Sequence, residues 1–152
     1  MEVVQLQRRY IEYATSLFNE GYLDDLFVQL QRLQDASNPE FVAEVISTYF
    51  KDSEKTLNNL NEIMYQQRID FKKVDACVQK LKGSSSSIGA QRIVNACIAL
   101  CTSYEEQNIV AYRRCAAQVT QEYAAVKDKL QNLFWLEQQI VIAGGAVPVL
   151  YK

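Results

Sequence analysis

The sequence contains no histidine among its 152 residues. Imidazole is the side chain that changes its charge near neutral pH, and it acts as general base, proton shuttle and metal ligand. Without it, Ser-His-Asp and Cys-His nucleophile activation, His-ligated zinc or haem, and histidine proton transfer are excluded. A large part of protein catalysis at neutral pH is therefore closed to this chain.

An excess of positive charge and a long apolar run are also missing. Sixteen Lys and Arg stand against eighteen Asp and Glu, which gives a net charge of −2. Such a chain has no positive field to attract phosphate backbones, so we expect no nucleic-acid binding. No apolar run reaches the roughly 18 residues that cross a bilayer, and no signal peptide is evident. We therefore expect no membrane partner and a location in the cytoplasm and nucleus.

Cysteines are few and lack metal-binding spacing. The four are Cys77, Cys97, Cys101 and Cys115, with no C-x-x-C pair. Two thiolates four residues apart make a poor zinc site without further ligands. We expect reduced thiols that serve as small buried side chains, and neither a metal nor another cofactor.

Strand signals are absent as well, because no segment alternates with a period of two. Apolar residues instead recur at steps of three and four, and two prolines and five glycines leave long uninterrupted stretches. At this length the chain is expected to form a single domain over residues 1–152. The pattern predicts helices over about 3–18, 23–35, 39–68, 71–88, 90–107 and 109–141 and a loose tail over 143–152. The predicted fold is all-α: the last four helices form an antiparallel four-helix bundle, and two additional N-terminal helices cover it.

Several residues mark helix ends. Gly21 stands where a left-handed residue would end the first helix. Asn38 followed by Pro39 predicts the start of the third helix, with Asn38 as the cap. Asp70 is placed to cap the fourth.

One stretch, residues 82–89, breaks the local rules. Its sequence KGSSSSIG has the composition of a linker, because glycine and serine are poor helix formers. The apolar stripe nevertheless keeps its phase from Phe71 through Ser85 to Ile88, which favours a continuous helix. If the helix continues, its surface consists of very small side chains and admits close approach by another backbone.

Gln79 would lie on the outward side of this helix, about 100° beyond the core-facing Val78. Lys82, Gly83 and Ser86 follow it at three, four and seven residues, and Asp75 precedes it by one turn. For an isolated glutamine, the ordinary interpretation is a solvated surface residue.

The segment from Val74 to Cys97 resembles the signature region of plant histidine-containing phosphotransfer proteins of the two-component (cytokinin) relay. It reads VDACVQKLKGSSSSIGAQRIVNAC. The similarity extends over nearly the whole chain and includes Ser16-Leu17-Phe18, Ser37–Phe41, Asp70–Asp75 and Leu136–Ile140. In that family the phosphoryl-accepting histidine stands three residues before the lysine of the K-G pair. The matching position here is Gln79, and the resemblance implies that Lys82 neutralises phosphoryl charge and Gly83 gives the docking partner room.

The sequence departs from the family pattern at four further positions. Cys77 stands where a second histidine is common, Lys80 where glutamine is usual and Val94 where lysine is frequent. Cys101 takes the place of an arginine near the acceptor. The chain thus resembles the family's pseudo members, which keep the fold and lack the acceptor.

This resemblance implies a function without catalysis. Phosphorelay needs a nucleophile that attacks an aspartyl phosphate, and an amide nitrogen is none because its lone pair is delocalised. We expect no catalytic residue and a receiver-docking face of Asp75, Gln79, Lys82, Gly83 and Ser86. The chain, as a monomer, would bind receiver domains of hybrid sensor kinases or response regulators and act as a competitive negative regulator.

Two other functions remain open. A carrier could use Cys77, Ser84 or Ser86 as acceptor, although no general base accompanies them. A helical scaffold could have kept the bundle without any phosphorelay role, because fold does not imply function. Binding to an isolated receiver domain separates the scaffold from the competitor, and label transfer separates the carrier from both.

Overall fold

The computed structural model describes residues 2–105 and 108–150, which contain six α-helices and no β-strand. The helices are α1 (Val3–Asn19), α2 (Asp25–Arg32), α3 (Phe41–Met64), α4 (Phe71–Ser87), α5 (Gln91–Glu105) and α6 (Ile109–Ile142). The all-α prediction is therefore confirmed. No helix of the described part is long and apolar enough to cross a membrane.

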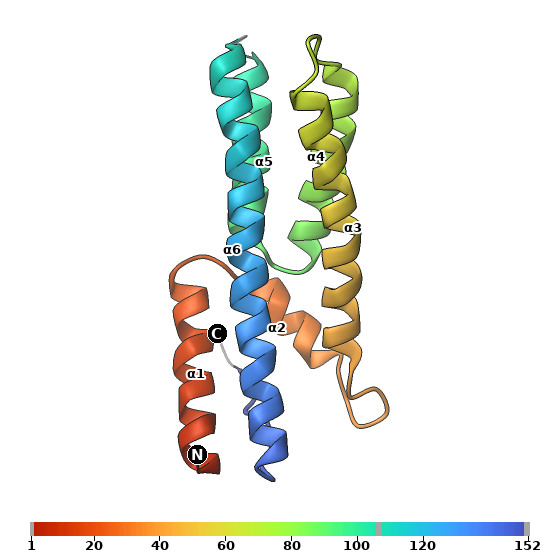
Figure 1. Cartoon of the computed structure of the whole chain (residues 1–152). Coiled ribbons are helices and arrows are strands. Elements are labelled where there is room, and N and C mark those ends of the chain that lie inside the picture. The colour runs from red at the N-terminus through yellow and green to blue at the C-terminus, as the bar shows by residue number, and fades with distance from the viewer. Residues whose placement is uncertain (1, 106–107, 151–152) are drawn as a thin grey trace.

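Helices α3 to α6 run alternately up and down and form an antiparallel bundle (Figure 1). The 34-residue helix α6 is twice as long as the 17-residue α4, so it extends below α4 and α5. Helix α1 packs against this lower part of α6, and the short helix α2 contacts α4. The predicted bundle with two N-terminal cover helices is confirmed.

One apolar core runs through both halves of the molecule. Its largest fully buried side chains come from the cover helices and their connection as well as from the bundle: Tyr10, Leu17, Leu23, Phe27, Ile46, Leu60, Leu81, Ile93, Leu100, Leu130, Leu133 and Ile140. Burial of an aliphatic or aromatic side chain of this size contributes about 1.5–3 kcal/mol. The N-terminal helices are therefore part of the folding unit.

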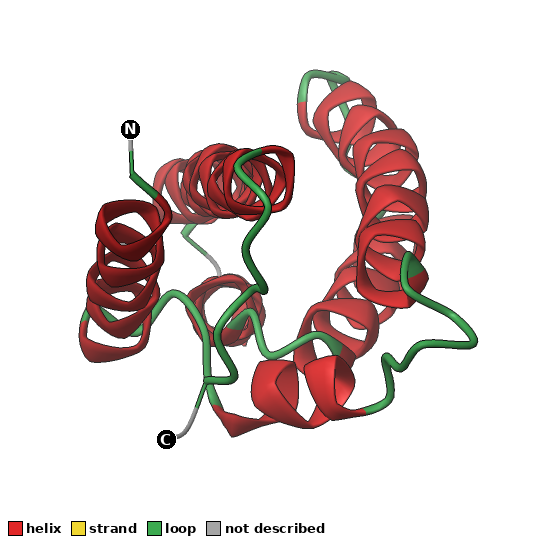
Figure 2. Cartoon of the chain, turned by 90° about the horizontal axis from the view of Figure 1, so that it is seen from below, coloured by secondary structure: helices red, strands yellow, loops and turns green. Residues whose placement is uncertain are grey.

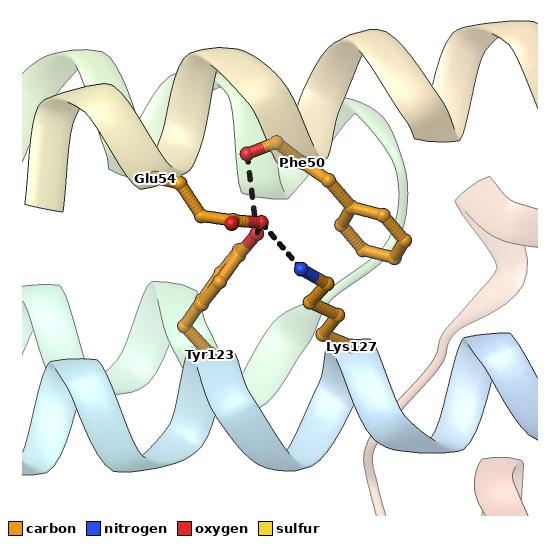
Figure 3. Close-up of polar contacts among 4 residues, drawn as sticks. All are labelled: Phe50, Glu54, Tyr123 and Lys127. Atoms are coloured by element: carbon orange, nitrogen blue, oxygen red, sulfur yellow. Dashed lines mark hydrogen bonds and ion pairs between the residues drawn. The ribbon is translucent and has the colours of Figure 1, made fainter.

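A polar contact joins α3 to α6 at mid-height (Figure 3). The Tyr123 hydroxyl donates to Glu54 Oε2 at 2.6 Å, and Lys127 Nζ lies 2.8 Å from the same oxygen. The Lys127 ammonium also lies 5.5 Å from the centre of the Phe50 ring. Apolar packing and this ionic contact together fix the pairing of the two long helices.

The predicted start of the third helix is wrong. Asn38 and Pro39 belong to a turn in which the Asp35 carboxylate accepts hydrogen bonds from Ser37 and from the Asn38 backbone N–H. Such an aspartate turn competes with helix formation, so α2 ends at Arg32 and α3 begins only at Phe41.

The third helix also ends earlier than predicted, at Met64 and not near residue 68. Residues 65–68 all have exposed side chains, Tyr65 at 88%, so no burial holds them in the helix. Asp70 does cap α4, as predicted, by accepting from the Lys73 N–H. The predicted end of the fifth helix, residue 107, lies outside the described residues.

The tail after α6 is not loose over residues 143–150. Gly144 has a φ of +88°, and the Gly145 N–H returns to the Ile140 carbonyl, so the chain reverses. Gln7 then donates to the Ala146 carbonyl at 2.8 Å, and Leu150 is buried. Figure 1 shows the tail turning back alongside the helices, and in the view from below its loop runs towards α2 (Figure 2). Residues 151 and 152 lie outside the described part.

Candidate functional site

Helix α4 is continuous across the stretch of small residues. It runs from Phe71 to Ser87 without a break, so the helical interpretation holds and the linker interpretation is wrong. Two serine hydroxyls donate hydrogen bonds to backbone carbonyls of the preceding turn. Ser84 donates to the Leu81 carbonyl at 3.2 Å, and Ser87 donates to the Ser84 carbonyl at 2.8 Å. These bonds satisfy the hydroxyls within the helix.

The inner face of α4 consists of Val74, Val78, Leu81 and Ser85, all buried. Ser85 is fully buried, and its hydroxyl lies 2.6 Å from the Tyr49 hydroxyl of α3. This pair holds the small-residue part of α4 against α3 and fixes its rotation. The opposite side of the helix must therefore face outward.

The outward side carries all five residues that the sequence assigns to docking. Asp75, Gln79, Lys82 and Ser86 follow at steps of four, three and four, so they lie in one row. Asp75 and Gln79 are exposed, whereas Lys82 and Ser86 are half-buried. Gly83 lies beside this row, and a Cβ added there has no heavy atom within 4 Å. The helix thus brings the five together on one accessible face.

A cleft of about 500 Å³ opens beside Gln79, between α4, α5 and the start of α6. Its lining residues are Phe71, Lys72, Val74, Asp75, Val78, Gln79, Leu100, Cys101 and Tyr112. Cys101, at the position matched with an arginine, therefore shares a cleft with Gln79. Lys82, Gly83 and Ser86 lie further along α4 and do not line it.

Cys77 and Cys97 are poor nucleophiles in these surroundings. Cys97 is fully buried, and burial raises the pKa of its thiol to about 12. Cys77 lines a different cavity, with Asn59 and Glu62, and burial raises its pKa as well. Because the thiolate is the reactive form, neither thiol is activated at neutral pH. In the described part, no three metal-ligating side chains come together.

The close packing behind the site was missed at the sequence level. Gly89, with φ +82°, ends α4, and its carbonyl accepts from the Asp24 N–H at 3.0 Å. A Cβ at Gly89 would lie 2.6 Å from Asp24 Oδ1 and 2.7 Å from the Phe27 nitrogen. Glycine is required here because α2 begins directly against the end of α4. The sequence signal that could have indicated this packing is the Ile88-Gly89 pair directly after the serines.

The bundle and its outward α4 face define a helical protein of the Hpt type, and the sequence matches the Hpt domain over residues 44–129. It is 53% identical to histidine-containing phosphotransfer protein 1 of Arabidopsis thaliana, over 99% of this chain and 97% of that protein. It is 41% identical to pseudo histidine-containing phosphotransfer protein 2 of Oryza sativa subsp. japonica, over 92% and 93%. The crystal structure of a histidine-containing phosphotransfer protein of Medicago truncatula superposes with a TM-score of 0.86 at 43% identity, over 93% of this chain and 96% of that one.

The chain therefore belongs to the histidine-containing phosphotransfer family. Relatives named histidine-containing and relatives named pseudo histidine-containing both match along nearly the whole length. Similarity alone thus assigns the family and not the subgroup. The assignment to a subgroup depends on the residues at the site.

Proposed function

We propose that this protein is a non-accepting member of the plant phosphorelay family that binds receiver domains and competes with phosphate-carrying members. One observation carries the proposal: the chain has no histidine, and the matched acceptor position is an exposed glutamine on α4. The match to two rice proteins that are named pseudo histidine-containing phosphotransfer proteins supports the proposal.

The chemistry of Gln79 supports binding without transfer. Its amide nitrogen has no free lone pair, so it cannot attack an aspartyl phosphate. The side chain can still donate two hydrogen bonds and accept at its oxygen. At the rim of a cleft, such a group can bond to the acidic residues of a receiver site without forming a covalent intermediate.

The surroundings of Gln79 favour a protein partner. Gly83 leaves open space next to it, and the half-buried Lys82 supplies a positive charge one turn away. A flat helix face of small side chains allows another backbone to approach closely, and the lysine complements an acidic pocket. Competition then requires only comparable affinity and abundance, because occupancy follows mass action.

A carrier that uses another acceptor is disfavoured by the same surroundings. The Ser84 hydroxyl donates to the Leu81 carbonyl within its own helix, and the raised pKa of Cys77 keeps that thiol protonated. Activation of a hydroxyl or thiol requires an adjacent base or a lowered pKa. A serine phosphate would also be too stable to relay.

The test combines label transfer with competition. A receiver domain carrying radiolabelled phosphate is mixed with this protein, and separately with a histidine-containing member in the presence of increasing amounts of this protein. We expect this chain to stay unlabelled and transfer to the carrier to fall as its concentration rises. Label on this chain at the carrier's rate would overturn the proposal in favour of a carrier, and no effect on transfer would favour a scaffold.

The setting of this function also belongs to the proposal. We place the protein in a cytokinin relay, with hybrid kinase and response regulator receivers as partners, in the cytoplasm and nucleus, and as a monomer. Localisation of a fluorescent fusion and light scattering of the purified chain are the direct measurements.

A further inference from the structure

A second group of cavities lies at the opposite end of the molecule, under the folded-back tail. Two adjoining cavities of about 310 and 320 Å³ share Gln34, Val42, Glu137 and Val147 in their linings. Glu137 is 25 residues beyond Tyr112 of the α4 cleft, which corresponds to about 37 Å along α6. This site is therefore separate from the docking face on α4.

The first cavity contains a buried hydroxyl without a hydrogen-bond partner and a half-buried carboxyl without an ion-pair partner among the described residues. Tyr10 is fully buried and lines the cavity, yet its hydroxyl has no hydrogen-bond partner among the described residues. Buried hydroxyls are nearly always hydrogen-bonded, because an unsatisfied one carries the full cost of its desolvation. Such a hydroxyl can form a hydrogen bond to a polar group of a bound ligand.

The second group is the Glu137 carboxyl, which lines both cavities. No lysine or arginine in residues 2–105 and 108–150 forms an ion pair with it. Burial, followed by the nearby Glu40 carboxylate, raises the pKa of Glu137 to about 7. Burial, followed by the Glu137 carboxyl, raises the pKa of Tyr10, which lines the same cavity.

The charged groups around Glu137 form no ion pair with it among the described residues. Arg32 lines the first cavity from α2 but is exposed, and Glu40 lines the second from the start of α3. The tail over 143–150 contains no ionisable side chain. The Val42 N–H donates to the side-chain Oε1 of Gln34 at 3.0 Å, and the half-buried Gln31 amide lies beside Tyr10. The site thus presents oxygen acceptors and one carboxyl that no ion pair of the described residues neutralises.

The rest of the lining is apolar and includes the tail itself. Val28, Val42, Val147, Pro148 and Leu150 line the first cavity. A mainly apolar pocket with a few converging polar groups is the usual form of a small-molecule site. The tail covers it and is held by a few contacts, among them the hydrogen bond from Gln7 to Ala146.

We infer that this cavity binds a small organic cation, a primary ammonium group with a short apolar body. The ammonium would donate to the Glu137 carboxylate and to the Tyr10 hydroxyl oxygen, and the apolar body would lie against Val28, Val42 and the tail. A cation satisfies all three deficits at once, because it pairs the carboxylate, bonds the hydroxyl and fills apolar space. A neutral ligand leaves the ionised carboxylate unpaired.

The charge pairing has a measurable consequence for pH. Binding requires the ionised carboxylate, so below the free-site pKa the ligand must displace a proton. That pKa is about 7, so affinity should increase by up to about tenfold for each unit by which the pH rises towards 7. Above pH 7 the affinity should level off. An alkylammonium stays charged throughout this range, as a lysine side chain does.

The experiment uses hexylammonium as the probe and 1-hexanol as its neutral match, with the full chain. Backbone amide NMR signals of Ala146, Val147, Val149 and Leu150 report on the site during titrations between pH 5.5 and 8. We expect saturable hexylammonium binding with a Kd near about 1 mM at pH 8, and at least about tenfold weaker binding at pH 5.5. Hexanol should bind more weakly and without pH dependence.

Two variants and one control make the assignment specific. Glu137→Gln mimics the protonated carboxyl and should keep the fold while it removes both the affinity gain and the pH dependence. Tyr10→Phe removes only the unpartnered hydroxyl and should weaken binding severalfold. Glu12→Gln removes the same charge at an exposed position of α1 and should change neither the affinity for hexylammonium nor its pH dependence. Equal binding of hexanol and hexylammonium, unaltered binding by Glu137→Gln, or no saturable shift at all would overturn the inference, and none of these results bears on receiver docking.

Discussion

The hydroxyls of Tyr49 and Ser85 lie 2.6 Å apart in the buried interface between α3 and α4. Burial raises the pKa of Tyr49 to about 12, against the opposing effect of the Ser85 hydrogen bond. The tyrosine ring also packs against Phe50 and Tyr123 at centroid distances of 6.0 and 6.2 Å. This contact anchors the part of α4 whose opposite face carries Lys82, Gly83 and Ser86.

Removal of either hydroxyl should lower stability, and the two losses should not add. Ser85→Ala leaves a buried tyrosine hydroxyl unbonded, and Tyr49→Phe leaves the serine, so each should lower the free energy of unfolding by about 1–2 kcal/mol. The double variant should lose clearly less than the sum, because no unpaired group remains. Urea unfolding of the four proteins measures the coupling. Strictly additive losses would mean that the two hydroxyls do not interact in solution.

The sequence predicted one half of this contact. The periodicity from Phe71 to Ile88 placed Ser85 on the buried stripe, because helical phase depends only on local spacing. It could not supply Tyr49 as the partner, since that pairing depends on how two separate helices pack. For the same reason the outward row of Asp75 and Gln79 was predictable, whereas the cleft that joins Gln79 to Cys101 was not.

The failures of prediction come from non-local contacts and competing turns. The glycines and proline of the tail suggest a loose end, but Val147 and Leu150 pack against the core and the Gln7 amide binds the tail backbone. Likewise Asn38-Pro39 is a good helix start in isolation, and the Asp35 turn overrides it. Local sequence signals compete with such contacts, and only the folded chain decides between them.

Gln79→His should restore an acceptor without disturbing the fold. Gln79 is exposed, so the expected change in unfolding free energy is within about 0.5 kcal/mol. The imidazole supplies the nucleophile that the amide lacks. The variant should take label from a phosphorylated receiver while the parent chain stays unlabelled. A correctly folded variant that binds the receiver yet remains unlabelled would show that further departures also block transfer.

Cys101 is the first departure to examine, because it lines the same cleft as Gln79. Cys101→Arg would place a guanidinium at that cleft, where it could stabilise phosphoryl charge. The double variant Gln79→His, Cys101→Arg should therefore transfer faster than Gln79→His alone, as measured by the initial rate of labelling. Equal rates in two stably folded proteins would show that Cys101 does not limit transfer.

The contact between α3 and α6 predicts an acid-dependent loss of stability. The hydrogen bonds from Lys127 and then Tyr123 lower the pKa of Glu54, so the carboxylate is favoured in the folded state. A lowered pKa contributes stability above the unfolded value, about 4.3 for glutamate, and the contribution is lost as the pH falls through the folded value. Glu54 is 46% exposed, so solvent screening keeps the effect below about 1 kcal/mol.

Glu54→Gln should accordingly be less stable than the parent at pH 7, and the two should converge below about pH 4. Thermal unfolding across this range measures the difference, with Glu62→Gln as an exposed control on the same helix. A constant difference at all pH values would assign the loss to packing and not to the charge of Glu54.

Two glycines at the same end of α4 should respond oppositely to alanine. Gly83 lies within the helix with no heavy atom within 4 Å of an added Cβ, so Gly83→Ala should stabilise the free protein by up to about 1 kcal/mol. Gly89 has φ +82°, and its Cβ would collide with Asp24 and the Phe27 backbone. Gly89→Ala should therefore destabilise by about 2 kcal/mol or more. Thermal melts of both variants decide the matter, and a stabilised Gly89→Ala would contradict the observed approach of α2.

Alanine at position 83 would make the free protein more stable, so the presence of glycine there needs a reason. Close approach of a receiver domain beside Gln79 supplies one. Gly83→Leu should keep the fold, because the position faces open space, but its side chain would stand in the contact. We expect receiver binding to weaken by about 2 kcal/mol, or roughly thirtyfold, and competition with a phosphate carrier to fall with it. Thr15→Leu adds an exposed leucine on α1, away from α4, and should leave binding unchanged. If folded Gly83→Leu titrates receiver domains and competes as strongly as Thr15→Leu does, the partner docks on another face of the molecule.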